Sequence, residues 1–236
     1  MAAAATRAMR YTTFFLDLDH TLFDSDTSET TAFVRAMEAA GINRPEQHFS
    51  AYRKINVELW AAVERGEINP HGVRTRRFEL LVAEQRLDAD PQHLANDFVT
   101  GLGAHGELYE GAFEVIDRLS SQASLALVTN GLGEVQRARV ERLGIGEFFD
   151  AIVISAEVGV AKPGTEIFDL VFGALDAPRK ESTLMVGDSL SSDMQGGTNF
   201  GIATCWYNPK QQENRRDDLV SHEIQDLKEL LGFVAV

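Results

Sequence analysis

The sequence predicts an α/β protein in which a doubly wound parallel sheet carries an inserted helical domain. Two observations support this prediction. Five short runs rich in Val, Ile, Leu or Phe recur along the 236-residue chain, and runs that are apolar on both faces are typical of parallel strands covered by helices on both sides. About a hundred residues separate the first run from the second, far more than one crossover connection needs.

The apolar runs alternate with helical segments after the long gap. The predicted strands are FFLDLD (14–19), LALVTN (125–130), AIVIS (151–155), TLMVGD (183–188) and IATCWYN (202–208). Segments 134–144 and 165–175 place apolar residues at helical spacing, and Gly144 is the expected end of the first of them. Strands that alternate with helices indicate a doubly wound α/β sheet.

The long interval is predicted to be entirely helical. Apolar residues recur at helical spacing in segments 27–41, 45–66, 73–87 and 91–102. In the second segment Phe49, Tyr52, Ile55, Leu59 and Val63 form a stripe that we expect to pack in a core. We therefore predict an α/β catalytic core of residues 1–23 and 106–236, and a helical cap of residues 24–105.

Composition narrows the possible partners and location. The net charge is -14 and the sequence pI is about 4.8, so the phosphate backbone of polymeric nucleic acid would be repelled. Cys205 is the only cysteine, which excludes an intrachain disulfide and favours a reducing, cytoplasmic location. No apolar stretch reaches the roughly 18 residues of a membrane span. The opening MAAAATRAMR lacks the apolar centre of a signal peptide, and we interpret it as a disordered tail.

Polar residues cluster after the predicted strands. Asp17, Asp19 and Thr21 follow the first strand, Thr129 and Asn130 follow the second, Lys162 follows the third, and Asp188 follows the fourth with Asp193 beyond it. Ligands of open α/β sheets bind outside the carboxyl ends of the strands. We therefore expect these side chains to meet at one edge of the sheet.

This set of groups suits phosphoryl transfer. Oxygen ligands such as Asp17 and Asp188 fit Mg²⁺, and a carboxylate that faces a metal-held phosphorus can form an aspartyl-phosphate. A second carboxylate two residues on can protonate the leaving oxygen and later activate water. Thr129, the Asn130 backbone N–H and Lys162 can hold phosphate oxygens. Each motif alone has an ordinary structural explanation, such as a turn or a helix cap, but their joint occurrence at strand ends predicts a site.

The same motifs resemble those of the haloacid dehalogenase-like hydrolase superfamily. DLDHT is similar to its first motif, VTN to its second, the lysine of VAKPG to its third and GDSLSSD to its fourth. The resemblance implies that Asp17 is the nucleophile and Asp19 the general acid and base. It also implies that the inserted helices are a cap that closes over the site.

The resemblance assigns the other site residues as well. Thr129 would bind phosphate beside the Asn130 backbone, and Lys162 would neutralise the phosphoryl group and the nucleophile. Asp188 would bind Mg²⁺ together with the nucleophile and the Asp19 backbone carbonyl. Asp193 would hold Lys162 or a metal-bound water, and Thr21, two residues after Asp19, resembles the residue that phosphatases have there.

Further stretches resemble the pyrimidine 5′-nucleotidase branch of the superfamily. These are INVELW (55–60), GEIN (66–69), RTRRFELL (74–81), ISAEVGVAKP (154–163) and ATCWYN (203–208). The predicted function is therefore a Mg²⁺-dependent phosphatase for a small phosphorylated metabolite, with a pyrimidine nucleoside 5′-monophosphate as the preferred substrate. The alternatives are a sugar-phosphate phosphatase or phosphomutase and, outside the enzymes, a phospho-receiver signalling module.

The sequence says less about the cap. Phe23 follows the first motif and is expected to line the mouth of the pocket. Trp60 and Phe78 are candidates for stacking, and Arg74 and Arg77 for contact with an anion. The two arginines share one face of a helix, and a solvated basic face is the favoured interpretation of them. No cap residue is predicted as a ligand.

Overall fold

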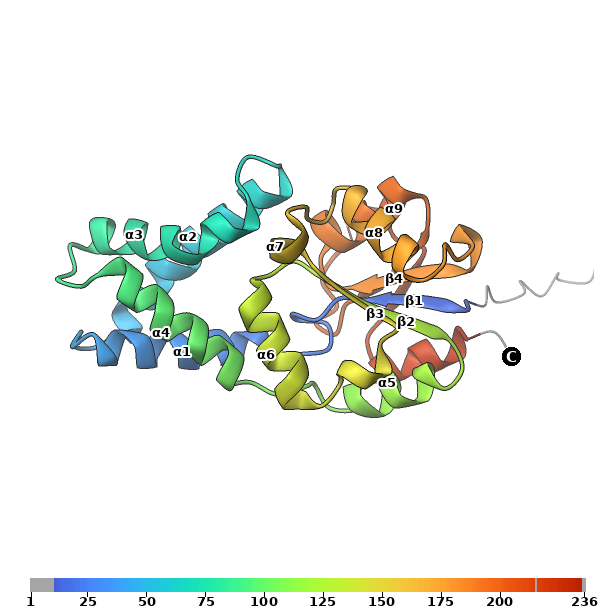
Figure 1. Ribbon diagram of the computed structural model, residues 1–236, viewed down its shortest axis with the longest axis horizontal. Coiled ribbons are helices and arrows are strands. Elements are labelled where there is room, and N and C mark those ends of the chain that lie inside the picture. The colour runs from blue at the N-terminus through green and yellow to red at the C-terminus, as the bar shows by residue number, and fades with distance from the viewer. Residues whose placement is uncertain (1–10, 215, 235–236) are drawn as a thin grey trace, which may run out of the picture.

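The computed structural model describes residues 11–214 and 216–234. The prediction of a disordered tail concerns residues outside these ranges. A parallel sheet flanked by helices forms one end of the molecule, and a group of helices extends from it at the other end (Figure 1). The predicted fold class is confirmed. Within the described ranges no helix is long and apolar enough to cross a membrane.

The sheet has six strands in the order β3-β2-β1-β4-β5-β6, and every neighbouring pair is parallel. The strands are β1 (Thr13–Leu16), β2 (Ser124–Thr129), β3 (Ala151–Ile154), β4 (Thr183–Gly187), β5 (Ala203–Tyr207) and β6 (His222–Ile224). The first five lie where the sequence predicts strands, whereas the short edge strand β6 was not predicted. The strand order reverses between β1 and β4, which places a topological switch point there.

Helices cover both faces of the sheet. They are α5 (Ala112–Ser120), α6 (Gly133–Leu143), α7 (Ser155–Val158), α8 (Glu166–Ala174) and α9 (Gln195–Phe200), and a π-helical turn, Leu190–Met194, follows β4. Successive residues of a strand point to opposite faces. Phe14 and Leu16 accordingly join the apolar cluster that contains α5, while Phe15 packs against Phe168 of α8. Both core helices predicted from spacing are present.

The inserted helices have an apolar core of their own. They are α1 (Ser25–Ala39), α2 (Glu46–Glu64), α3 (Val73–Gln85) and α4 (Pro91–Ala104). The ring of Tyr52 lies 4.8 to 5.8 Å, between centroids, from those of Phe33, Phe78 and Phe98. Residues 24–105 therefore contain the helices expected of a cap, while the division of the chain at these two points stays a prediction.

The inserted helices rest on α6 of the sheet part. Leu132 and Val135, where α6 begins, belong to the same apolar cluster as the inserted helices. Helix α6 thus touches both parts of the molecule.

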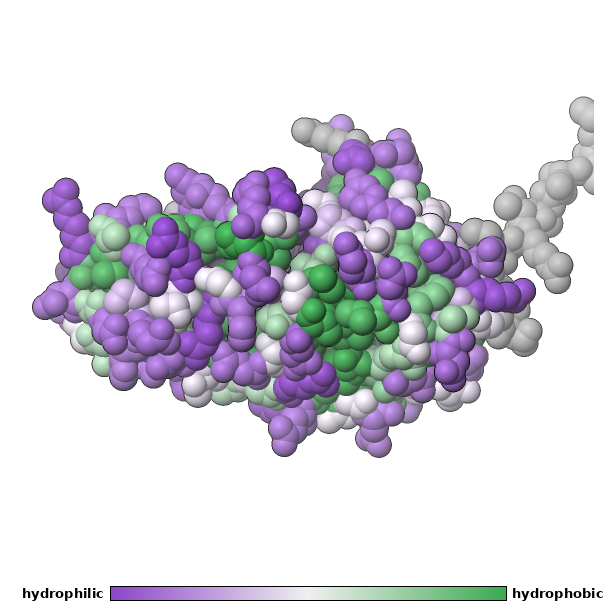
Figure 2. Space-filling model, turned by 45° about the horizontal axis from the view of Figure 1, so that its top comes forward, coloured by the Kyte–Doolittle hydropathy of each residue, from purple (hydrophilic) through white to green (hydrophobic). Residues whose placement is uncertain are grey.

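Figure 2 shows mainly hydrophilic side chains on the visible face of both parts, with hydrophobic side chains gathered in smaller areas.

Candidate active site

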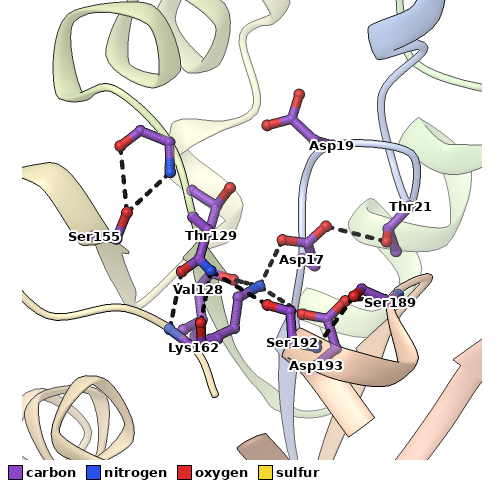
Figure 3. A network of polar contacts seen from close by, with 12 residues as sticks. Asp17, Asp19, Thr21, Val128, Thr129, Ser155, Lys162, Ser189, Ser192 and Asp193 are labelled. Atoms are coloured by element: carbon purple, nitrogen blue, oxygen red, sulfur yellow. Dashed lines mark hydrogen bonds and ion pairs between the residues drawn. The ribbon is translucent and has the colours of Figure 1, made fainter. Parts of the chain in front are cut away.

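The predicted site residues converge at the carboxyl ends of β1, β2 and β4 (Figure 3). A cavity of about 450 Å³ lies over this edge of the sheet. Asp17, Asn130, Lys162 and Asp188 line it from the sheet side, and residues of the inserted helices line it from the other side. Its volume falls in the range of roughly 300–1,000 Å³ typical of small-molecule sites.

Lys162 is the centre of the polar network. Its Nζ donates to Asp17 Oδ1 at 2.6 Å, to Asp193 Oδ1 at 2.6 Å and to the carbonyl oxygen of Val128 at 2.7 Å. These bonds use all three hydrogens of the ammonium group. Burial alone would lower the pKa of Lys162, but the charges of Asp17 and Asp193 outweigh burial and raise it. The lysine is therefore a fixed cation between two carboxylates.

Asp17 is held on three sides. Its backbone N–H donates to Val186 O of β4 at 3.0 Å, which ties it to the end of the sheet. Thr21 Oγ1 donates to its Oδ2 at 3.2 Å, and Lys162 binds its Oδ1. Burial is the largest cause of the raised pKa of the Asp17 carboxyl, and Lys162 only partly offsets it. The carboxylate is thus oriented, buried and short of positive charge.

Three carboxylates come close enough to share a cation. Oxygen atoms of Asp17, Asp188 and Asp193 lie within 4.8 Å of one another. Burial, followed by the charges of Asp193 and Asp17, holds the pKa of Asp188 well above its usual value. Carboxylate oxygens are the ligands that Mg²⁺ prefers. The donor set and its excess negative charge therefore fit a magnesium ion.

Asp193 reaches this cluster because Gly187 leaves it room. The π-helical turn after β4 carries Asp193, whose Oδ2 accepts a hydrogen bond from the Ser189 backbone N–H at 3.1 Å. A Cβ on Gly187 would lie 2.1 Å from that same oxygen. Only glycine fits at this position of β4 while Asp193 holds Lys162.

Asn130 lines the cavity, whereas the neighbouring Thr129 does not. The Asn130 side chain lines the cavity and binds the Lys162 backbone twice, through Oδ1 to its N–H and through Nδ2 to its carbonyl oxygen, both at 2.9 Å. Thr129 is buried and does not line the cavity, and its Oγ1 accepts from Gln136 Nε2 at 3.0 Å. The amide therefore positions the lysine loop, a contact that was not predicted.

The side chain of Asp19 points away from the other carboxylates (Figure 3). Arg139 Nη1 donates to its Oδ1 at 2.6 Å, Gln136 Nε2 donates to its Oδ2 at 2.5 Å, and Ser25 Oγ also donates to Oδ1. Burial would raise the pKa of the Asp19 carboxyl, but Arg139 and the hydrogen bonds hold it below its usual value. Asp19 is therefore kept as a carboxylate, and the predicted metal contact of this residue concerns its backbone carbonyl alone.

Gln136 and Arg139 were missed as site residues. They lie on α6, 117 and 120 residues from Asp19 in the sequence. Arg139 also donates to the Leu102 carbonyl oxygen at 3.0 Å and to Ser28 Oγ at 3.2 Å, so it joins Asp19 to α1 and α4. One feature of the sequence could have identified them. Both are polar residues on the face of segment 134–144 that its apolar residues mark as buried, and a buried polar side chain needs a partner.

Three expectations for the cap side are wrong. Phe23 does not line the cavity: it is fully buried in the core, with the Arg139 guanidinium 4.3 Å from its ring centroid. Phe78 is fully buried among the rings of the helical insertion. Arg77 is not solvated, because its side chain is only 3% exposed and faces the cavity. The expectations rested on position after a motif or on a shared helix face. Neither pattern indicates whether a side chain is buried, and all three side chains are buried.

Of the other two cap candidates, one lines the cavity and the other does not. Trp60 lines the cavity and stays available to a ligand. Arg74 does not line it and instead pairs with Glu134 Oε1 of α6 at 2.6 Å. The two arginines of the predicted basic face therefore have different surroundings.

Comparison with known proteins identifies the family. Residues 11–201 match the haloacid dehalogenase-like hydrolase family. The chain therefore belongs to the haloacid dehalogenase-like hydrolases. The predicted family is confirmed, and the prediction of a phosphatase-type hydrolase rather than a signalling module is confirmed at this level.

Several curated proteins are similar over nearly the whole chain. YfnB of Bacillus subtilis, described as a HAD-hydrolase, is 34% identical over 96% of this chain and 97% of its own. YjjG of Escherichia coli, a pyrimidine 5′-nucleotidase, is 32% identical over 94% of this chain and 97% of its own. PynA of Streptococcus pneumoniae, also described as a pyrimidine 5′-nucleotidase, is 31% identical over 94% of both chains.

A solved structure agrees with the fold in detail. A crystal structure of YfnB, described as bound to magnesium and as revealing interdomain movement, matches with a TM-score of 0.86 at 33% identity. The match covers 96% of this chain and all of that one. The similarity therefore includes the sheet and the inserted helices together.

Proposed function

We propose that the protein is a Mg²⁺-dependent phosphatase that hydrolyses pyrimidine nucleoside 5′-monophosphates through an aspartyl-phosphate on Asp17. The observation that carries this proposal is the position of Asp17. It lies at the switch point of the sheet, in contact with Lys162 and Thr21, and faces a cavity of small-molecule size. Asp188 and Asp193 stand close enough to complete a cation site with it.

In the first half of the reaction an oxygen of Asp17 attacks phosphorus, and the bond between phosphorus and the ester oxygen breaks. The negative charge of the entering phosphate opposes the effect of Arg139 on the pKa of Asp19, so Asp19 takes up a proton. Asp19 then gives this proton to the ester oxygen, and a neutral nucleoside leaves. Lys162 stays in contact with Asp17 and offsets negative charge as the aspartyl-phosphate forms. Asp17 and Asp188 would hold Mg²⁺, which would supply positive charge to offset that of the phosphate.

In the second half Asp19 is a carboxylate and accepts a proton from water. The water oxygen attacks phosphorus, the bond to Asp17 breaks, and inorganic phosphate leaves while Asp19 regains its proton. For this step the side chain of Asp19 must be ionised and fixed in place. The contacts with Arg139, Gln136 and Ser25 favour this state. Two carboxylates two residues apart thus have different tasks because their surroundings differ.

Two observations support the substrate. YjjG and PynA, both described as pyrimidine 5′-nucleotidases, are each similar to this chain over 94% of its length. The cavity is bounded on one side by the carboxylates and Lys162 and on the other by polar and aromatic side chains of α2 and α3. A small phosphorylated metabolite is therefore the proposed partner, and a cytoplasmic location stays a prediction from the single cysteine.

The test is hydrolysis of dUMP, UMP, dTMP, ribose 5-phosphate and glucose 6-phosphate, with Mg²⁺ and with EDTA. We expect Mg²⁺-dependent release of phosphate with the pyrimidine nucleotides preferred. Asp17→Asn is expected to remove turnover while the melting temperature stays near that of the wild type. Turnover by Asp17→Asn would contradict the mechanism, and a preference for sugar phosphates would contradict the substrate.

A further inference from the structure

Helix α2 presents two faces of different character. Tyr52, Ile55 and Val63 are buried in the apolar core of the inserted helices. Asn56, Val57, Trp60, Ala61 and Glu64 line the cavity, and their spacing of three and four residues places them on one face. The cavity face of α2 is therefore a continuous surface opposite the catalytic carboxylates.

The amide of Asn56 is locked in one orientation on this face. Its Nδ2 donates to Glu29 Oε1 at 2.8 Å, and its Oδ1 accepts from Arg77 Nη1 at 3.1 Å. A guanidinium only donates and an ionised carboxylate only accepts, so the amide cannot turn over without losing both bonds. Asn56 is half-buried, and the chemistry of an amide leaves it one further N–H and one further lone pair.

The groups that lock the amide are themselves fixed. Glu29 Oε1 also accepts from the Tyr52 hydroxyl at 2.9 Å, and Tyr52 is fully buried. Arg77 is 3% exposed, its Nε donates to the Val73 carbonyl oxygen at 3.2 Å, and its guanidinium carbon lies 5.1 Å from the centroid of the Phe98 ring. A buried arginine and a largely buried glutamate thus hold one amide at the wall of the cavity.

Trp60 stands one helical turn beyond Asn56 on the same face. An indole offers a flat apolar surface for a planar ring. A fixed donor and a fixed acceptor beside such a surface match a ring whose edge carries an acceptor next to a donor. Uracil and thymine have this edge in a carbonyl oxygen and N3–H, and cytosine has it in N3 and its amino group.

We propose that Asn56 recognises the base, by hydrogen bonding the edge of a pyrimidine ring that lies against Trp60. The proposal rests on the proposed function, since it assumes that the substrate enters with its phosphate at Asp17. Recognition of a base by its hydrogen-bonding edge and by stacking is the general way in which enclosed sites distinguish bases. Substrates without a base gain nothing from Asn56.

The experiment compares Asn56→Ala with Asn96→Ala, an exposed asparagine of α4 that does not line the cavity. The substrates are dUMP, its N3-methyl derivative and ribose 5-phosphate. We expect Asn56→Ala to lower kcat/KM for dUMP by about tenfold to a hundredfold, as loss of a buried hydrogen-bonding partner does. Ribose 5-phosphate turnover should not change, and Asn96→Ala should match the wild type on every substrate.

The N3-methyl substrate completes a cycle of protein and ligand changes. Wild type should discriminate against it, and Asn56→Ala should discriminate less by about the factor it loses on dUMP. Asn56→Leu keeps the side-chain size but has neither the amide hydrogens nor the amide oxygen, and it adds no charge beside Glu29. It should also lose the preference for dUMP, so it tests the proposal if the alanine variant does not fold.

Two results would overturn the role of Asn56. One is an equal loss on dUMP and on ribose 5-phosphate, which indicates a structural role, and the other is no loss on dUMP. Failure of the proposed function looks different, because wild type would then hydrolyse ribose 5-phosphate at least as well as dUMP. Folding is followed by thermal melts, and by ribose 5-phosphate turnover as an internal measure.

Discussion

At the scale of single residues, the two aspartates of the first motif show how surroundings assign chemistry. Asp17 binds Lys162, which is shared with Asp193, so it remains short of positive charge. Arg139 pairs with Asp19 and with no other carboxylate of the site. Asp19 also accepts hydrogen bonds from Ser25 and Gln136. The pKa of Asp17 is raised by burial, whereas the pKa of Asp19 is lowered because Arg139 outweighs burial.

Arg139 should therefore act as a positioning residue for Asp19. Arg139→Gln removes the charge that lowers the pKa of Asp19, so that pKa rises. In the proposed mechanism Asp19 is a carboxylate when water attacks, so the acidic limb of the kcat profile should move to higher pH. We expect kcat at neutral pH to fall by roughly tenfold to a hundredfold, part of the usual contribution of acid–base catalysis.

Arg142→Gln is the matched control for this variant. Arg142 lies on the same helix and binds Glu107 at 3.1 Å, but it does not touch Asp19. Its pH profile should overlay that of the wild type. If the acidic limb of Arg139→Gln also stays in place, Arg139 has only a structural role.

At the scale of elements, α6 joins the surroundings of Asp19 to the inserted helices, and α1 and α4 pack closely within them. Helix α6 carries Gln136 and Arg139 toward Asp19, and its first residues pack in the core of the inserted helices. Helices α1 and α4 approach closely because Gly101 faces Ala32. A Cβ on Gly101 would lie 2.8 Å from the Ala32 Cβ and 3.0 Å from its Cα.

Gly101→Leu should accordingly force α1 and α4 apart. Overpacking of this kind reduces the free energy of unfolding by about 1–3 kcal/mol, which urea denaturation can measure. Gly173→Ala is the opposite case, since Gly173 lies in α8 with nothing within 4 Å of the added carbon. It should stabilise the protein by about 0.5–1 kcal/mol through helix propensity. Equal effects of the two substitutions would contradict the close packing at Gly101.

At the scale of the whole molecule, the proposed magnesium site is assembled from distant parts of the chain. Asp17 follows β1, Asp188 follows β4, and Asp193 lies in the turn after it. A cation that binds this cluster binds only the folded chain, so it must stabilise the fold. The net charge of -14 destabilises the folded chain by repulsion, and a bound cation reduces this repulsion among the carboxylates.

Mg²⁺ should therefore raise the melting temperature. At a hundred times its Kd a ligand adds about 2.7 kcal/mol, which corresponds to several degrees for a domain of this size. Asp188→Asn should abolish most of this increase, whereas Asp169→Asn, an exposed carboxylate of α8, should retain it. An unchanged increase in Asp188→Asn would place the ion elsewhere.

The amino-acid sequence by itself determined the positions of β1 to β5 along the chain, the helical character of the insertion and the convergence of Asp17, Lys162, Asp188 and Asp193. These features depend on local periodicity and on the rule that parallel strands end at one edge. The edge strand β6, with His222 and Glu223 in three residues, has too little apolar pattern for that logic.

Only the tertiary structure decided which partner each polar side chain has. Gln136 and Arg139 meet Asp19 across more than a hundred residues, and Arg77 is buried against Asn56 rather than solvated. The physical reason is that such contacts depend on how the inserted helices pack on α6. Helical spacing indicates a shared face, but it does not indicate what covers that face.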